Sequence, residues 1–445
     1  MVRVGGQGLD GPLPARQSPA AARALWSGLD AAAYPIATLV MLAGLVRALT
    51  PSSYGILVLA LAASGLSLAI NPAIAATTTR FVSQSAGERK SGGQSVAGVV
   101  TAALLAVTVI DLTLLLGTAL FREPLARWVF GGAAAAPGTD AGDLLWLALL
   151  AVGIQQLDAV IAAAIRGLER FARQALLEVV ARAALAAAVM WAAWHTRSVA
   201  AVLIAQCVVC ALSVLVRAAA LRQLLPDRQL FRRSGTAQIS ALFKYGGWMW
   251  LTALAAVLYS SADRIIVGRS LGAAAAGQFN IYIQLTQLVH FVPSSLFAFS
   301  LPAFSRLAAQ GSEGARQIGP AYRTYLGVIS LTALGMALGL LAGWPVLLRV
   351  FAAGAVQDPQ WHVALLLTLN FLVLACNVAP YYLLLALGHS RSVAMVTACG
   401  TLIALLLMIA LIPRFGMAGA ALARLAYGAA ALVFLIQAHR ILKTQ

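Results

Sequence analysis

The sequence predicts an all-α polytopic membrane protein, with twelve transmembrane helices in two six-helix lobes around a central cavity. Hydrophobic residues make up 61% of the 445 residues, charged residues only 10%, and the mean hydropathy is +0.87. A soluble domain has about 45–50% apolar and about 25% charged residues. The apolar runs are long and do not alternate with polar residues, which indicates helices rather than a barrel.

Twelve apolar runs each reach the length of about 20 residues that a helix needs to cross a bilayer. The predicted spans are 25–46, 54–79, 95–120, 144–165, 174–194, 199–221, 245–267, 275–301, 322–343, 361–387, 392–412 and 417–438. All nine Trp residues lie at or just outside a span end, as expected of an aromatic belt.

Prolines inside four of these spans predict bent helices, because each proline removes one backbone hydrogen bond. They lie in spans one, two, eight and ten, at Pro35, Pro72, Pro293, Pro302 and Pro380. Bent helices suit cavity walls that open and close when two halves of a carrier rock against each other.

The chain divides into two lobes and three cytoplasmic segments. Residues 1–24 are rich in Gly, Pro and Ala and lack the apolar core of a signal peptide, so we expect a disordered cytoplasmic tail. A basic cytoplasmic linker at 222–244 separates an N-lobe at 25–221 from a C-lobe at 245–438. Residues 439–445 form the cytoplasmic C-tail.

The distribution of basic residues predicts the orientation. With both termini in the cytoplasm, the cytoplasmic segments hold 21 of the 31 Lys and Arg residues, including Arg217, and the outer loops hold seven. The excess of positive charge inside therefore places both termini in the cytoplasm. Because topology accounts for the net charge of +17, nucleic acid is not expected as a partner.

A weak internal repeat supports the division into two lobes. Three residues near the end of the first span recur near the end of the seventh at a constant offset of 222 positions: Arg47, Leu49 and Gly55 match Arg269, Leu271 and Gly277. Two halves in the same orientation imply a pseudo-two-fold axis along the membrane normal.

The composition of the loops and the spacing of the cysteines favour a carrier over a membrane enzyme of glycan assembly. The longest outer loop, 121–143, is a low-complexity segment with no evident scaffold for catalytic carboxylates. There is no phosphate-binding Gly-rich loop with Lys and Ser or Thr. Four cysteines lie inside spans without a metal-ligand spacing that includes His. We expect a carrier with no catalytic residues, no metal and no cofactor.

Polar residues inside the eighth and tenth spans are confined to one face of each helix. The eighth span carries Asn280, Gln284 and Gln287, continued by His290 and Ser294. The tenth carries Asn370, Asn377 and Tyr381. Such amides and hydroxyls either line a cavity and bind sugar hydroxyls and phosphate oxygens, or join packed helices by hydrogen bonds.

The charged residues at membrane depth differ between the two lobes. The second half holds Asp263, Arg264 and Arg424, and the two arginines are candidates for binding a lipid pyrophosphate, because a guanidinium binds phosphate bidentately. The first half holds Asp30, Asp111 and Asp158, which are candidates for coupling to H⁺ or Na⁺ or for simple paired burial.

The stretch from Asp263 to Gly277 resembles the seventh helix and following turn of the polysaccharide flippases. The resemblance rests on Asp263-Arg264, a short apolar run, Gly268, Leu271-Gly272 and Gly277, and on Leu301 to Leu307 at the end of the eighth span. These Wzx-like flippases of O-antigen and exopolysaccharide belong to the multidrug/oligosaccharidyl-lipid/polysaccharide (MOP) exporter superfamily, which includes the MATE-like drug exporters and the lipid II flippases.

The resemblance implies a transporter of polysaccharide and lipopolysaccharide biosynthesis in the bacterial inner membrane. Its substrate would be an oligosaccharide linked to undecaprenyl pyrophosphate, turned across the bilayer by alternating access, with polysaccharide polymerase or assembly proteins as further partners. The alternative is a cation-coupled multidrug or small-molecule exporter of the same superfamily, which would need acids facing the cavity. The acids of the first half keep that alternative open.

Overall fold

A computed structural model describes residues 20–69, 71–87, 96–131, 140–225, 247–297, 300–352, 356 and 359–444, and these residues form helices joined by short turns. The first half contains α1 (Ala20–Ala48), α2 (Pro51–Gly65), the 3₁₀ helix η1 (Leu66–Ala69), α3 (Asn71–Gly87), α4 (Val96–Leu120), α5 (Arg122–Phe130), α6 (Ala141–Gly167), α7 (Phe171–Thr196) and α8 (Val199–Leu224). The second half contains α10 (Gly247–Leu271), α11 (Ala273–Thr286), α12 (Leu288–Leu296), α13 (Ser300–Ala309), α14 (Gly311–Ala342), α15 (Trp344–Phe351), α16 (Trp361–Cys376), α17 (Val378–Ala386) and α18 (Ser390–Thr444). Most of the predicted N-tail and of the linker at 222–244 lies outside the described residues.

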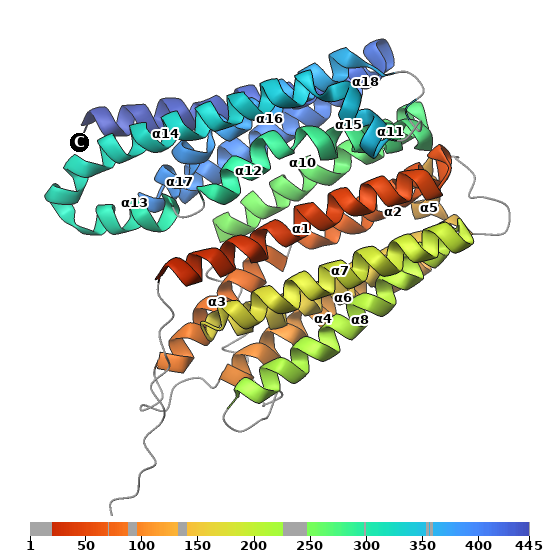
Figure 1. Ribbon diagram of the computed structural model, residues 1–445, viewed down its shortest axis with the longest axis horizontal. Helices are drawn as coiled ribbons and strands as arrows, with labels where there is room; N and C mark the ends of the chain where they lie inside the picture. The colour runs from red at the N-terminus through yellow and green to blue at the C-terminus, as the bar shows by residue number, and fades with distance from the viewer. Residues whose placement is uncertain are drawn as a thin grey trace, which may run out of the picture.

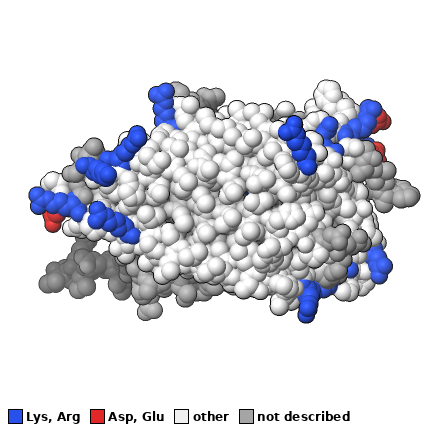
Figure 2. All heavy atoms as spheres, turned by 90° about the horizontal axis from the view of Figure 1, so that it is seen from above, with Lys and Arg blue, Asp and Glu red and all other residues white. Residues whose placement is uncertain are grey.

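The outside of the molecule is that of a multi-pass membrane protein. Within the described part of the chain, nine helical segments are long and apolar enough to cross a membrane, and α1 adds a shorter apolar segment at Pro35–Ala48. Figure 2 shows Lys and Arg side chains toward the two ends of the long axis, with the middle of that face free of charge. An uncharged band between two charged ends is the surface that a bilayer requires.

The element α18 is two helices that fold back on each other. Gly416 has φ 55° and ψ −137°, which is not helical and which glycine adopts without a Cβ clash. The Ser392 hydroxyl donates to the Gln437 side chain over 2.8 Å, across the bend. The bend coincides with the predicted boundary between spans 392–412 and 417–438. The nine long segments include α18 as a single segment, although it covers two predicted spans. The number nine therefore does not decide the number of spans, and the count of twelve stays a prediction.

Three of the long predicted spans that contain a proline are broken near that proline. Pro380 cannot donate a hydrogen bond to the carbonyl of Cys376, and α16 ends at Cys376. Pro293 lies inside α12, just after the break between α11 and α12 at Gln287. Pro72 lies at the start of α3, directly after the 3₁₀ turn η1. Each predicted span is therefore divided into two helices rather than smoothly curved.

The predicted outer loop at 121–143 contains a helix. The expectation that this segment offers no ordered scaffold is therefore wrong for residues 122–130. Residues 122–130 form α5, which ends at Gly131 in the left-handed conformation. The Arg122 guanidinium pairs with Asp140 over 2.8 Å and also with Asp143. These carboxylates are thus engaged in holding the two ends of the loop together, and they remain largely exposed.

The helices form two groups that meet mainly at one end of the molecule. In Figure 1 the helices α1–α8 (red to yellow-green) lie on one side and α10–α18 (green to blue) on the other. The groups approach each other where α2, α5, α11 and α15 lie, which we call the closed end. They diverge toward the end where α3 and α13 lie. Contacts between the groups run chiefly from α2 and η1 to α10 and α11.

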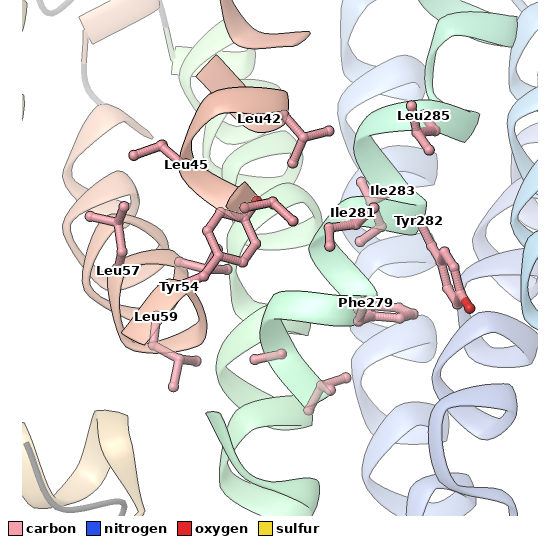
Figure 3. Packing of buried hydrophobic residues seen from close by; sticks show 14 of the residues in the cluster. Leu42, Leu45, Tyr54, Leu57, Leu59, Phe279, Ile281, Tyr282, Ile283 and Leu285 are labelled. Carbon is pink, nitrogen blue, oxygen red and sulfur yellow. The ribbon is translucent and has the colours of Figure 1, made fainter. Parts of the chain in front are cut away.

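One apolar core joins the two halves at the closed end. Figure 3 shows Tyr54 of α2 directed toward α11, beside Ile281, and both residues are buried. The two helices approach closely because glycines meet at their crossing: a Cβ on Gly277 would stand 3.2 Å from the Cα of Gly55. Close helix crossings at small residues are typical of membrane bundles.

Candidate functional site

The second half encloses a cavity of about 370 Å³ between α10, α11, α12, α16, α17 and α18. Polar and aromatic side chains dominate its wall. The polar lining consists of Thr252, Tyr259, Ser260, Arg264, Gln287, His290, Ser294, Asn377, Tyr381, Tyr382, Thr397, Arg424 and Tyr427. Among the described residues that line the cavity there are two arginines and no carboxylate, so its electrostatic character is positive.

Arg424 reaches this cavity from the second part of α18 and is held in a buried ion pair. Its guanidinium bonds the carboxylate of Asp263 on α10, and both side chains are at most 3% exposed. The guanidinium also lies over the ring of Tyr259, 4.2 Å from its centre. A charge at this depth persists only when it is paired. The pair therefore neutralises both groups and fixes α10 against α18.

Arg264 follows Asp263 in sequence but lies on the neighbouring face of α10. It is half-buried and lines the cavity. Its Nε donates to the side-chain oxygen of Asn280 over 2.7 Å, and its Nη1 donates to the carbonyl of Ser260. No ion pair joins Arg264 to an acid in the described part of the chain. Arg264 thus supplies a positive charge whose described partners are all neutral.

The predicted polar stripe of α11 and α12 divides between two roles. Gln287, His290 and Ser294 line the cavity. Asn280 is buried outside the lining and donates from Nδ2 to the hydroxyl of Tyr54 in the other half, over 2.8 Å. Gln284 accepts a hydrogen bond from Gln287 and is not a lining residue. Of the residues in this stripe, those at its α12 end line the cavity, and those in α11 do not.

The stripe of α16 and α17 divides in the same way. Asn370 is fully buried and its amide bonds the Tyr259 hydroxyl over 3.0 Å, so it joins α16 to α10. Asn377 and Tyr381 line the cavity. The Asn377 Nδ2 donates to the carbonyl of Val373, while its buried Oδ1 has no hydrogen-bond partner among the described residues. A buried oxygen without a partner costs stability.

Aromatic walls of the cavity were missed by the sequence analysis. Tyr427 and Phe434 follow Arg424 on one face of α18, at i+3 and i+10, and Phe371 faces them from α16. Tyr427 stacks on Tyr259 with ring centres 4.0 Å apart. The spacing of Arg424, Tyr427 and Phe434 was the available signal, because a helix repeats every 3.6 residues.

The first half holds a smaller cavity of about 200 Å³ between α6, α7 and α8. Arg217 lies there, 2% exposed, with its guanidinium 2.6 Å from Glu178 and 3.3 Å from Asp158. Arg217 is therefore a buried ion-pair residue of α8, and its assignment to the cytoplasmic side stays a prediction. Arg182 also pairs with Glu178, over 2.8 Å. Arg166 also lines the cavity, so its wall carries two acids and three arginines.

Asp111 is the intramembrane acid whose charge is least compensated. It is buried on α4, and its Oδ1 accepts a hydrogen bond from Gln156 over 2.8 Å. Gln156 also lies 3.3 Å from the hydroxyl of Ser67 in η1. The buried Oδ2 has no hydrogen-bond partner in the described structure. The side chain of Asp30 lies outside the described residues.

The structure thus brings together five of the nine predicted substrate-binding residues in one cavity. These five are Arg264, Gln287, Asn377, Tyr381 and Arg424. The other four lie in helix contacts around it: Asp263, Asn280, Gln284 and Asn370. The predicted central cavity between the lobes is not one of the two cavities described above, since each of these is lined by one half of the chain.

Comparison with known proteins gives the family and the fold. The profile of a family described as "Polysaccharide biosynthesis protein" matches residues 24–308, well over half of the chain. No curated protein sequence matches the chain. The chain is similar to the structure of an inward-facing multidrug resistance MATE family transporter of the MOP superfamily, with a TM-score of 0.65, 14% identity, and 97% and 96% of the two chains covered.

Two further solved structures show the same similarity. A MATE protein in complex with MaL6 has a TM-score of 0.65 at 13% identity, with 95% of this chain and 96% of that chain covered. A MOP superfamily transporter from Pyrococcus furiosus has a TM-score of 0.64 at 12% identity, with 95% of each chain covered; its description states a reverse polarity of the binding pocket. At these identities the similarity establishes an all-helical, MATE-like fold.

Proposed function

The chain belongs to the polysaccharide biosynthesis protein family, and on that premise we propose that it turns a lipid-linked oligosaccharide across the bacterial inner membrane by alternating access. It is a transporter of the MOP superfamily and not an enzyme. The proposed substrate is of the undecaprenyl-pyrophosphate type, and polysaccharide polymerase or assembly proteins are its proposed partners. Both termini are proposed to face the cytoplasm.

The proposed architecture is twelve spans in two lobes of six, 25–221 and 245–438. The two groups of helices in Figure 1 support it, as do the bend at Gly416 and the breaks near Pro72, Pro293 and Pro380. In the proposed orientation the closed end is periplasmic. The splayed end then faces the cytoplasm, where the proposed substrate is made.

The observation that carries the proposal is the chemistry of the cavity in the second half. Arg264 offers a guanidinium without an acidic partner among the described residues, which suits a phosphate oxygen. Tyr381, Tyr427 and Phe434 offer apolar ring surface in the same cavity, and the tyrosine hydroxyls offer hydrogen-bonding groups for a sugar. The volume of about 370 Å³ lies at the small end of ligand sites. It fits the pyrophosphate and the first sugar rather than a whole oligosaccharide.

We propose Asp111 as the coupling site, ahead of Asp158 and Asp30. An acid at membrane depth needs a cation, a proton or an ion-pair partner. Asp158 has such a partner in Arg217, whereas the hydrogen-bond donor to Asp111 is the neutral amide of Gln156. Binding of H⁺ or Na⁺ at Asp111 would satisfy its buried Oδ2.

The same transporter fold supports a second candidate function, export of organic cations. The similarity to MATE drug transporters favours it. The wall of the larger cavity opposes it, because the guanidinium of Arg264, which has no acidic partner among the described residues, repels a cation. The two functions are distinguished by measuring how susceptible cells are to cationic drugs with and without the protein. We expect the susceptibility to be the same in both.

A flipping assay tests the proposed function. Purified full-length protein is placed in vesicles with undecaprenyl pyrophosphate carrying a fluorescent sugar, and a membrane-impermeant quencher reports the lipid in the outer leaflet. We expect the quenched fraction to rise above that of protein-free vesicles. A quenched fraction equal to that of protein-free vesicles would overturn the proposal.

A further inference from the structure

The closed end is held by two hydrogen bonds that are related by the internal repeat. Arg47, at the end of α1, donates from Nη2 to the carbonyl of Val350 in α15, over 2.5 Å. Arg269, at the end of α10, donates to the carbonyl of Trp128 in α5. The two donors are 222 positions apart, and so are the two acceptors. Each half therefore donates one arginine hydrogen bond to a short helix of the other half, α15 or α5, at equivalent positions of the repeat.

Repeat-related glycines lie between these two arginine bonds. Gly55 of α2 and Gly277 of α11 are also 222 positions apart and are in direct contact. A Cβ on Gly55 would stand 1.8 Å from the carbonyl oxygen of Ala273, which is closer than any two such atoms can lie. The close contact of the two halves in this state therefore requires glycine at position 55.

A buried hydrogen-bond chain connects this contact to the cavity. The Tyr54 hydroxyl, beside Gly55, accepts from Asn280 Nδ2 over 2.8 Å, and Asn280 Oδ1 accepts from Arg264 Nε over 2.7 Å. Tyr54 and Asn280 are less than a tenth exposed. The amide of Asn280 thus has both of its ends engaged, one by the cavity arginine and one by the opposite half.

We propose that Tyr54 and Asn280 are positioning residues that tie anion binding at Arg264 to opening of the closed end. The inference rests on the proposed function, in which a lipid pyrophosphate binds Arg264. In the proposed geometry the phosphate binds the guanidinium bidentately through Nε and one Nη. The Nε then leaves Asn280, whose amide is no longer held in the orientation that donates to Tyr54.

Loss of this buried bond leaves the apolar core and the two exposed arginine bonds to hold the closed end. Surface-exposed bonds to a charged side chain are weak, because water competes for both partners. Binding in the cavity therefore lowers the free energy needed to separate α2 from α11. When the cavity is empty, the hydrogen-bond chain from Arg264 through Asn280 to Tyr54 is intact and stabilises the closed end. The closed end then prevents a leak across the membrane in the absence of substrate.

Distances between spin labels test this relay in the full-length protein. Labels are placed at Phe121 and Phe415, which are exposed and belong to different halves, after replacing the four cysteines with serine. The protein is studied in nanodiscs with and without undecaprenyl pyrophosphate. We expect the lipid to lengthen the distance in the parent protein. Tyr54→Phe should show the longer distance already without lipid, in at least twice the parent's fraction of molecules.

Tyr322→Phe is the matched control, because its buried hydroxyl has no hydrogen-bond partner in the described part of the chain and α14 lies away from the contact between halves. It should behave as the parent does. Asn280→Leu is the second relay variant and should behave like Tyr54→Phe. If both relay variants respond to lipid as the parent does, the relay is refuted while the proposed function stands. If the parent binds no lipid pyrophosphate, it is the proposed function that fails.

Discussion

Arg264 and Arg424 enter the same cavity, but only Arg424 has a carboxylate partner. Arg424 is paired with Asp263 and covered by Tyr259, whereas Arg264 bonds the neutral amide of Asn280 and a backbone carbonyl. The two arginines were predicted to share one role, in headgroup binding. Their environments separate them: Arg424 stabilises the second half, and Arg264 is the residue we propose for the anion.

The buried Asp263–Arg424 pair predicts an asymmetric stability effect. Asp263→Asn leaves a buried guanidinium without its countercharge, which costs about 3–5 kcal/mol. Thermal unfolding of the purified protein should therefore begin at a clearly lower temperature. The double variant Asp263→Asn, Arg424→Met removes both charges and should recover part of the loss. A single variant as stable as the parent would contradict the assignment of this pair to structure.

Gly55 predicts a conformational effect that does not require loss of folding. Gly55→Ala places a Cβ on the carbonyl of Ala273 in the closed state only, and such overlap costs at least about 1–3 kcal/mol. The open fraction, measured with the Phe121 and Phe415 labels, should rise about tenfold. Gly117→Ala is the matched control, since a Cβ there meets no atom within 4 Å. An unchanged label distance in Gly55→Ala, with a monodisperse protein, would refute the glycine contact as a requirement for closure.

Asp111 and Asp158 predict different consequences of the same chemical change. Asp111→Asn keeps the hydrogen bond with Gln156 possible but removes the ionisable group, so flipping should no longer respond to an imposed H⁺ or Na⁺ gradient. Asp158→Asn should keep that response and lower thermal stability, because Arg217 loses one of its two acids. Flipping rates in vesicles with imposed gradients measure both. A full gradient response in Asp111→Asn would remove it from coupling.

Much of the fold could be predicted because a bilayer imposes simple length and polarity rules. Apolar runs gave the helices of both halves, and prolines marked the breaks near Gln287 and Asn377. The offset of 222 positions predicted from Arg47 and Gly55 also relates their contacts in space. Two local features were not predicted. Helix α5 forms within a Gly- and Ala-rich loop. Trp344, which lies at a predicted span end, is buried inside the protein.

The site was harder to predict, because helical periodicity shows which residues share a face but not what that face contacts. Asn280 and Gln287 lie on one stripe, yet one bonds the opposite half and the other lines the cavity. The burial of Arg217 was missed because its ion-pair partners, Asp158 and Glu178, lie on other helices. In a chain rich in Ala and Leu, nothing in the local sequence distinguishes a lipid-facing surface from a packed one.

The most direct test of the central claim is the affinity of the purified protein for undecaprenyl pyrophosphate, with and without the Arg264 charge. A bidentate charged contact contributes about 1.5–3 kcal/mol, so Arg264→Gln should weaken binding by about 10- to 100-fold. Arg414→Gln, an exposed arginine of the same half, should leave the affinity unchanged. Equal affinities for the parent and Arg264→Gln would contradict the account.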